Sequence, residues 1–168
     1  MREGPVIQSI SGGQMEHYLQ TGNPAWTSKA VFDEWIQHDL TPKQLKELTD
    51  KYGASPGSYM VRSSKAGTPE LATTRIQYGN VAILPQPVAG IGSDNFAIVH
   101  GAGAPPPYPY IAAYLWARHT FQADALLHFG THGSLEFTPQ KQVALGASDW
   151  GEALVAPLPH FYYYTIGN

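Results

Sequence analysis

The chain has 168 residues, of which 43% are hydrophobic. That is enough for one domain with a buried core, and it excludes a disordered tail. The net charge is −3 and no lysine or arginine cluster occurs, which argues against a nucleic-acid-binding protein. Cysteine is absent, so disulfides, thiolate metal sites and cysteine nucleophiles are excluded.

Charged residues make up only 14% of the chain, against about 25% in a typical soluble domain. The chain also closes on PHFYYYTIGN, with four consecutive aromatic residues. Both features predict large contact faces, and they favour a slice of a larger multidomain subunit. No run approaches the roughly 18 apolar residues of a membrane span, and the first thirty residues lack a signal-peptide core. A cytoplasmic protein without a membrane span is therefore expected.

In chain order, residues 1–28 are predicted to be a loosely structured segment, because turn-forming residues dominate it. Two helices follow. Ser28 is the predicted cap of the first helix, and Thr41 caps the second, with proline at its first position and Gln44 completing a capping box. Gly53 is the predicted end of the second helix. Three histidines are predicted to be solvated surface residues: His17, His38 and His119.

Residues 53–80 look like surface loop, rich in glycine, proline and serine. Buried strands are predicted at 81–84, 96–100 and 123–130, with a helix at 110–121. Apolar strands alternating with helices predict an α/β domain, a mainly parallel sheet with flanking helices, over residues 29–168.

The stretch HFGTHGSLEF carries the most reactive side chains of the chain. His128 is predicted at the end of a strand, His132 in the following loop, and Glu136 in a first helical turn. Ligands of open α/β sheets bind outside the carboxyl ends of the strands, so the three side chains can converge there. Gly130 and Gly133 let the backbone bend tightly and let a bulky ligand approach.

Imidazole and carboxylate groups suit a borderline divalent metal and also carry protons. The stretch is not HExxH, so the zinc-protease mechanism does not follow. No phosphate-binding P-loop occurs. The alternative is a hydrogen-bonded core histidine followed by a capping glutamate, and spacing alone leaves both interpretations open.

Other residues are candidates for the walls of such a site. His100 closes a predicted strand and can face the same crevice, and His160 follows APLP near the end of the chain. Tyr108, Tyr110 and the tyrosines at 162–164 are candidates to line a pocket for a flat ligand, although aromatic residues are more often part of a core.

Three segments carry a family resemblance: QYGNVAILPQPVAG, PPPYPYIAAYLWARHTFQADALLHFGTHGSLEFTPQKQVAL and LPHFYYYTIGN. In this order they resemble the large subunit of cobaltochelatase (CobN) and the H subunit of magnesium chelatase. The likeness covers residues 29–168, and H-x-G-x-H-G-x-L-E is its most specific part. Two positions depart from the family pattern: Gln140 stands in place of glycine, and Ala156 in place of a common acidic residue.

The resemblance implies insertion of a divalent metal, Co²⁺ or Mg²⁺, into a tetrapyrrole, with ATP hydrolysed by separate AAA+ partner subunits. By motif position, it implies Glu136 as base and metal carrier, with His128 and His132 as ligands or proton relays. Lys141 or Arg118 can meet a carboxylate of the macrocycle, although a solvated charge is the commoner role for each. Members of this family are far longer, so the chain is expected to be inactive by itself.

Three alternatives remain open beside metal insertion. Some relatives act on haem and run metal removal, so a dechelatase carries the same residues. A non-catalytic tetrapyrrole or metal carrier would bind its ligand without needing Glu136 for function. A His/Glu metallohydrolase would need an open metal position with a bound water.

Overall fold

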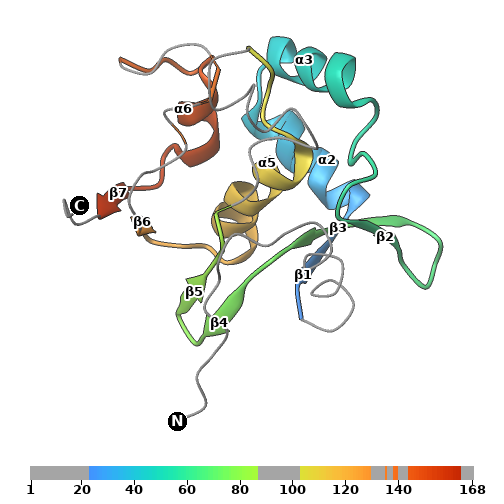
Figure 1. Ribbon diagram of the computed structural model, residues 1–168, viewed down its shortest axis with the longest axis horizontal. Helices are drawn as coiled ribbons and strands as arrows, with labels where there is room; N and C mark the ends of the chain where they lie inside the picture. The colour runs from blue at the N-terminus through green and yellow to red at the C-terminus, as the bar shows by residue number, and fades with distance from the viewer. Residues whose placement is uncertain (1–22, 87–102, 130–134, 136–137, 140–143, 164–168) are drawn as a thin grey trace, which may run out of the picture.

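The computed structural model describes residues 23–86, 103–129, 135, 138–139 and 144–163. It is a mixed helix and strand structure with three small sheets (Figure 1). The strands are β1 Ala25–Ser28, β2 Val61–Ser63, β3 Pro69–Thr73, β4 Ile76–Tyr78, β5 Val81–Ile83, β6 Leu126–Phe129 and β7 His160–Tyr163. The helices are α2 Lys29–Asp39, α3 Pro42–Tyr52, α5 Tyr108–Leu115, the π-helical turn η1 Trp116–Thr120, and α6 Trp150–Val155.

Helices α2 and α3 begin where the sequence predicts. The Ser28 hydroxyl accepts a hydrogen bond from the amide of Val31. Thr41 and Gln44 form the predicted capping box, and the backbone amide of Gly53 closes the last turn of α3. Gln44 is also fully buried, and its amide group donates to the carbonyl of Ser148 at 3.2 Å. The same side chain therefore caps α3 and joins it to the segment before α6.

The first sheet, in the order β1-β3-β2, is antiparallel throughout. Its central strand β3 buries Leu71, Ala72 and Thr73, and both α2 and α5 pack against it. The interpretation of residues 53–80 as surface loop was wrong for β2, β3 and β4, because a short strand between turns shows little apolar alternation. Four residues of the predicted loose segment, Ala25–Ser28, form β1, while residues 1–22 lie outside the described residues.

The predicted strand at 81–84 exists as β5, but it is not buried. It forms an antiparallel hairpin with β4, which turns at Gly79 in the left-handed region, φ +57°. Val81 and Ile83 are exposed, whereas Ala82 and Leu84 pack against the core. The apolar run alternates because a two-stranded hairpin lying on a core can bury only one of its faces.

The core is built around α5, all eight residues of which are buried (Figure 1). Phe32 from α2, Leu71 from β3 and Leu154 from α6 pack into the same cluster. The chain continues from α5 into η1, where the amide of Phe121 donates to the carbonyl of Trp116 five residues earlier, at 2.9 Å. The predicted helix at 110–121 is therefore confirmed, with a π-helical last turn.

Strands β6 and β7 form the one parallel pair among the described residues. The predicted combination of helices and strands is confirmed, but the mainly parallel sheet is confirmed only in part, because the other strand pairs of the described residues are antiparallel. The predicted strand at 96–100 lies outside the described residues. No helix in the described part of the chain has the length and apolar character needed to cross a membrane.

The β6–β7 pair has one face toward the core and one exposed face. The exposed face carries four large apolar side chains, between 57% and 80% exposed: Leu127, Phe129, Phe161 and Tyr163. The prediction of a fully buried strand at 123–130 was therefore wrong for alternate positions. Parallel strands are normally covered on both faces, so this face has the character of a contact surface.

Candidate functional site

His128 lies one residue before the end of β6, as predicted, and its side chain points to the core face of the strand pair. The residue is only 9% exposed. Its neighbour across the pair, Tyr162, stacks on the imidazole with ring centroids 4.7 Å apart and planes 12° from parallel. His160 and Tyr114 approach the same ring at 6.0 and 6.1 Å. Rings from β7 and α5 therefore fix the orientation of the imidazole.

His128 also lines an open cavity of about 140 Å³ between the end of β5, α5, η1 and β6. On its wall the amide of Gln86 donates to the hydroxyl of Tyr114 at 3.3 Å. Tyr110, predicted to line a ligand pocket, is fully buried in the core behind this wall, with its hydroxyl 3.4 Å from that of Tyr114. Pockets for drug-sized ligands measure roughly 300–1,000 Å³. This cavity can therefore admit an ion with waters or the edge of a larger ligand, but it cannot enclose a tetrapyrrole.

Five of the predicted site residues lie outside the described residues: His100, His132, Glu136, Lys141 and Tyr164. The described residues nearest Glu136 in the sequence, Leu135 and Thr138, are buried. The amide and the hydroxyl of Thr138 both donate to the carbonyl of Leu135. Both residues border Gly151 at the start of α6. The convergence of His128, His132 and Glu136 stays a prediction.

Tyr108, predicted to line a ligand pocket, lies in the core and is 3% exposed. Its hydroxyl donates to the carbonyl of Gly53 at 2.8 Å, and its ring meets Phe32 edge-on. Burial and the Asp33 carboxylate raise the pKa of Tyr108, against the opposite effect of a hydrogen bond with Thr49. The hydroxyl is therefore a stable donor, and it ties α5 to the end of α3.

We expect Tyr108→Phe to lower the free energy of unfolding by about 0.5–1.5 kcal/mol, because the hydrogen bond from the buried Tyr108 side chain to the carbonyl of Gly53 is lost. Urea denaturation measures this difference. Tyr78→Phe is the matched control, since Tyr78 is 63% exposed and its hydroxyl should not affect stability. An unchanged unfolding free energy in Tyr108→Phe would contradict this structural role and leave a ligand contact as the better interpretation.

Tyr114 and Gln86 are two residues of the cavity wall that sequence reasoning did not assign to a site. Tyr114 lies within the predicted helix at 110–121, and Gln86 lies just after the predicted strand at 81–84, so neither stood in a recognisable motif. The structure places them together because the end of β5 packs beside α5. His160 and Tyr162 did stand among the candidate wall residues, and the register of β7 with β6 puts both beside His128.

His119, predicted to be a surface histidine, is only partly exposed, at 27%, because its side chain lies against Asp39. His38 is exposed, as predicted, and lies beside the same carboxylate. Burial raises the pKa of Asp39, but hydrogen bonds with His119 and His38 and the charge of Arg118 outweigh it, so this pKa lies below its usual value. The cluster was invisible in the sequence because about 80 residues separate its two parts.

Comparison with known proteins supports the family resemblance. The family profile described as CobN/Magnesium Chelatase matches residues 5–168. The catalytic subunit of cobaltochelatase from Mycobacterium tuberculosis has a similar structure, with a TM-score of 0.74 at 30% identity, covering 89% of this chain and 13% of that one.

Curated relatives come from both the magnesium and the cobalt branches. The H subunit of magnesium chelatase from Cereibacter sphaeroides is 35% identical over 160 residues, 95% of this chain and 13% of that protein. The aerobic cobaltochelatase subunit CobN of Pseudomonas aeruginosa is 42% identical over 93 residues, 55% of this chain and 8% of that protein. The chain thus spans about a tenth of the length of these relatives. With a family match over nearly its whole length, and a fold shared with a solved member, the chain belongs to the CobN/magnesium chelatase family.

Proposed function

We propose that this chain is part of the catalytic region of a chelatase subunit that inserts a divalent metal, Co²⁺ or Mg²⁺, into a tetrapyrrole. The observation that carries the proposal is the position of His128. It is the first histidine of the H-x-G-x-H-G-x-L-E motif, and it lines a cavity beside a parallel strand pair, held between aromatic rings. His128 lies one residue before the carboxyl end of β6, and the carboxyl ends of parallel strands are where open α/β sheets bind their ligands.

The chemistry of insertion fits the residues of the motif. The incoming ion needs ligands that hold it and then release it, and the two pyrrole N–H protons need an acceptor. Imidazole nitrogens of His128 and His132 suit the first task for a borderline ion such as Co²⁺, whereas Mg²⁺ prefers oxygen ligands and would rely on Glu136. Glu136 is the proposed proton acceptor, since a carboxylate near a bound cation is a usual general base.

The partners follow from the family and from the exposed apolar face of β6–β7. We place the remainder of a longer subunit against that face, because four large apolar side chains are exposed there. AAA+ subunits that hydrolyse ATP are the proposed energy source for metal insertion. The proposed location of the assembly is the cytoplasm. The chain by itself is then expected to bind ligand without turning it over.

A titration of the chain with haem, a free-base porphyrin and a cobyrinate-type corrinoid, followed by absorbance, tests this proposal. Selective binding of one macrocycle, with lower affinity in His128→Ala, would support a tetrapyrrole site at His128. The macrocycle that binds would indicate whether the chain belongs to the cobalt or the magnesium branch of the family. Gln37→Ala is the control, an exposed change on α2 away from the cavity. Macrocycle binding that is equal in wild type and His128→Ala, with the fold intact, would contradict a role for His128.

Further measurements separate the alternatives. Preferential binding of haem, with loss of its iron in the complete subunit, would favour a dechelatase. A complete subunit that binds a macrocycle yet works equally well with Glu136→Gln would favour a carrier. Ester or amide hydrolysis that requires an added metal would favour the metallohydrolase.

A further inference from the structure

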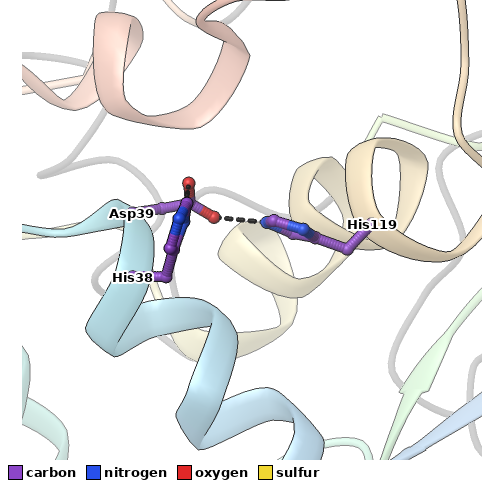
Figure 2. Close-up of side chains that lie close together, drawn as sticks. All are labelled: His38, Asp39 and His119. Atoms are coloured by element: carbon purple, nitrogen blue, oxygen red, sulfur yellow. Dashed lines mark hydrogen bonds and ion pairs between the residues drawn. The ribbon is translucent and has the colours of Figure 1, made fainter.

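Figure 2 shows three possible metal ligands that are close together: His38 and Asp39 at the end of α2, and His119 in η1. None of them belongs to the motif. The His119 Nε2 lies 2.5 Å from one carboxylate oxygen of Asp39, and the His38 Nδ1 lies 3.1 Å from the other. One donor atom from each residue lies within 4.8 Å of the other two. Two imidazoles and a carboxylate thus converge from two elements far apart in the sequence.

Neighbouring side chains hold two of these three groups in place. Arg118 donates to one oxygen of Asp39 at 2.8 Å and to the carbonyl of Ala153 at 2.9 Å, which ties α2, η1 and α6 together. The ring of His119 stacks on Trp35, with centroids 5.5 Å apart. The π-helical turn that presents Arg118 and His119 is a rare geometry that occurs frequently at functional sites.

The exposure of the three residues differs in a way that suits capture of an ion. The Asp39 side chain is 5% exposed and that of His119 27%, whereas that of His38 is 75% exposed. An ion from solvent would meet His38 first and then the two fixed groups. His38 can also change its rotamer readily, because most of its side chain is in contact with solvent.

We propose that His38, Asp39 and His119 bind a borderline divalent cation of the Zn²⁺ or Co²⁺ type, each through one atom, with water completing the coordination. Two nitrogens and one oxygen suit these ions better than Mg²⁺ or Ca²⁺, which prefer oxygen ligands. Arg118 then has the place of an outer-shell group, since ligating carboxylates are themselves hydrogen-bonded. This site shares no residue with the motif and does not depend on the proposed function.

Binding of an ion would move the three groups slightly apart. Bond lengths of about 2.0–2.2 Å place tetrahedral ligands roughly 3.4 Å from one another. The contacts of Asp39 with His119 and His38 are shorter, at 2.5 and 3.1 Å, so the ion would replace these hydrogen bonds by separating the groups slightly. The larger part of that adjustment separates His119 from Asp39 and requires a small shift of the His119 ring, whereas rotation of the exposed His38 ring supplies the smaller part.

The test is a titration of the full 168-residue chain with Co²⁺, followed by its visible d–d absorption, and with Zn²⁺, followed by calorimetry. We expect both ions to bind, and excess Mg²⁺ not to displace them. His38→Ala and His119→Gln should each lower the affinity of the proposed site for both ions by at least about 10–100-fold. Even changes to residues that only contact a metal ligand typically cause a loss of this size. Gln37→Ala, next to His38 on α2, should bind both ions as wild type does.

A second variant separates this site from the motif. His128→Ala should leave the affinity of the proposed site unchanged, so the loss in His38→Ala cannot be assigned to the motif. Because His38 is exposed, His38→Ala should keep the wild-type circular dichroism and unfolding midpoint without metal. Absence of Co²⁺ and Zn²⁺ binding in wild type would overturn the proposal, as would equal affinity and stoichiometry in wild type, His38→Ala and His119→Gln.

Discussion

Glu136→Gln is expected to lower the rate of metal insertion by about 10²–10⁴-fold in a complete chelatase subunit assembled with its ATPase partners. The change keeps the size of the side chain but removes the negative charge and the proton acceptor. Pyrrole nitrogens must lose two protons as the metal enters, so a missing base raises the barrier of that step. Absorbance of the metallated tetrapyrrole measures the rate directly.

The control for this variant is Glu34→Gln, the same exchange at an exposed position of α2. Tetrapyrrole affinity should be close to wild type in Glu136→Gln, because a general base acts on the chemical step and not on ground-state binding. Insertion at the wild-type rate would remove Glu136 from the mechanism. A lost affinity with an unchanged maximal rate would make it a binding residue instead.

Phe32→Ala is expected to lower the free energy of unfolding by about 3–5 kcal/mol, a large part of the stability of an ordinary domain. Phe32 is fully buried on α2 and meets the ring of Tyr108 edge-on, with centroids 6.0 Å apart. Truncation removes buried apolar surface and leaves a cavity between α2 and α5. Denaturation with urea measures the difference, and the dependence of the unfolding free energy on urea concentration should be the same in both proteins.

The matched control is Val31→Ala, one residue earlier on the same helix and 41% exposed. It should change the unfolding free energy by no more than about 0.5 kcal/mol, as exposed substitutions usually do. A similar small loss in Phe32→Ala would mean that the contact between α2 and α5 does not hold the fold together. The central place of α5 in the core would then be wrong.

The features that could be predicted from the sequence are local ones. The caps of α2 and α3 depend on atoms three residues apart, so Ser28, Thr41 and Gln44 specify them without any distant contact. The helix at 110–121 depends on its own apolar spacing. The motif from His128 to Glu136 is contiguous. Together with the two other segments that resemble the family, it was sufficient to identify that family.

Tertiary structure alone decided which strands pair, because strand pairing depends on partners far away in the chain. Strand β3 lies between β1 and β2 in antiparallel register, although nothing in its five residues marks it as central. The apolar run at β5 became a half-exposed hairpin, since its outer face meets solvent and not a second layer in the described part of the chain. The parallel register of β6 with β7 is what brings Tyr162 onto His128.

The cluster of His38, Asp39 and His119 was decided in the same way. Each histidine by itself resembles an ordinary surface residue, and no spacing rule links positions about 80 residues apart. The packing of α2 against the core, the π-helical turn after α5 and the hold of Arg118 on Asp39 bring them together. Local hydrogen bonds thus determine where the helices begin and end. Long-range packing determines which side chains become neighbours, and those neighbours decide the chemistry that the side chains can perform.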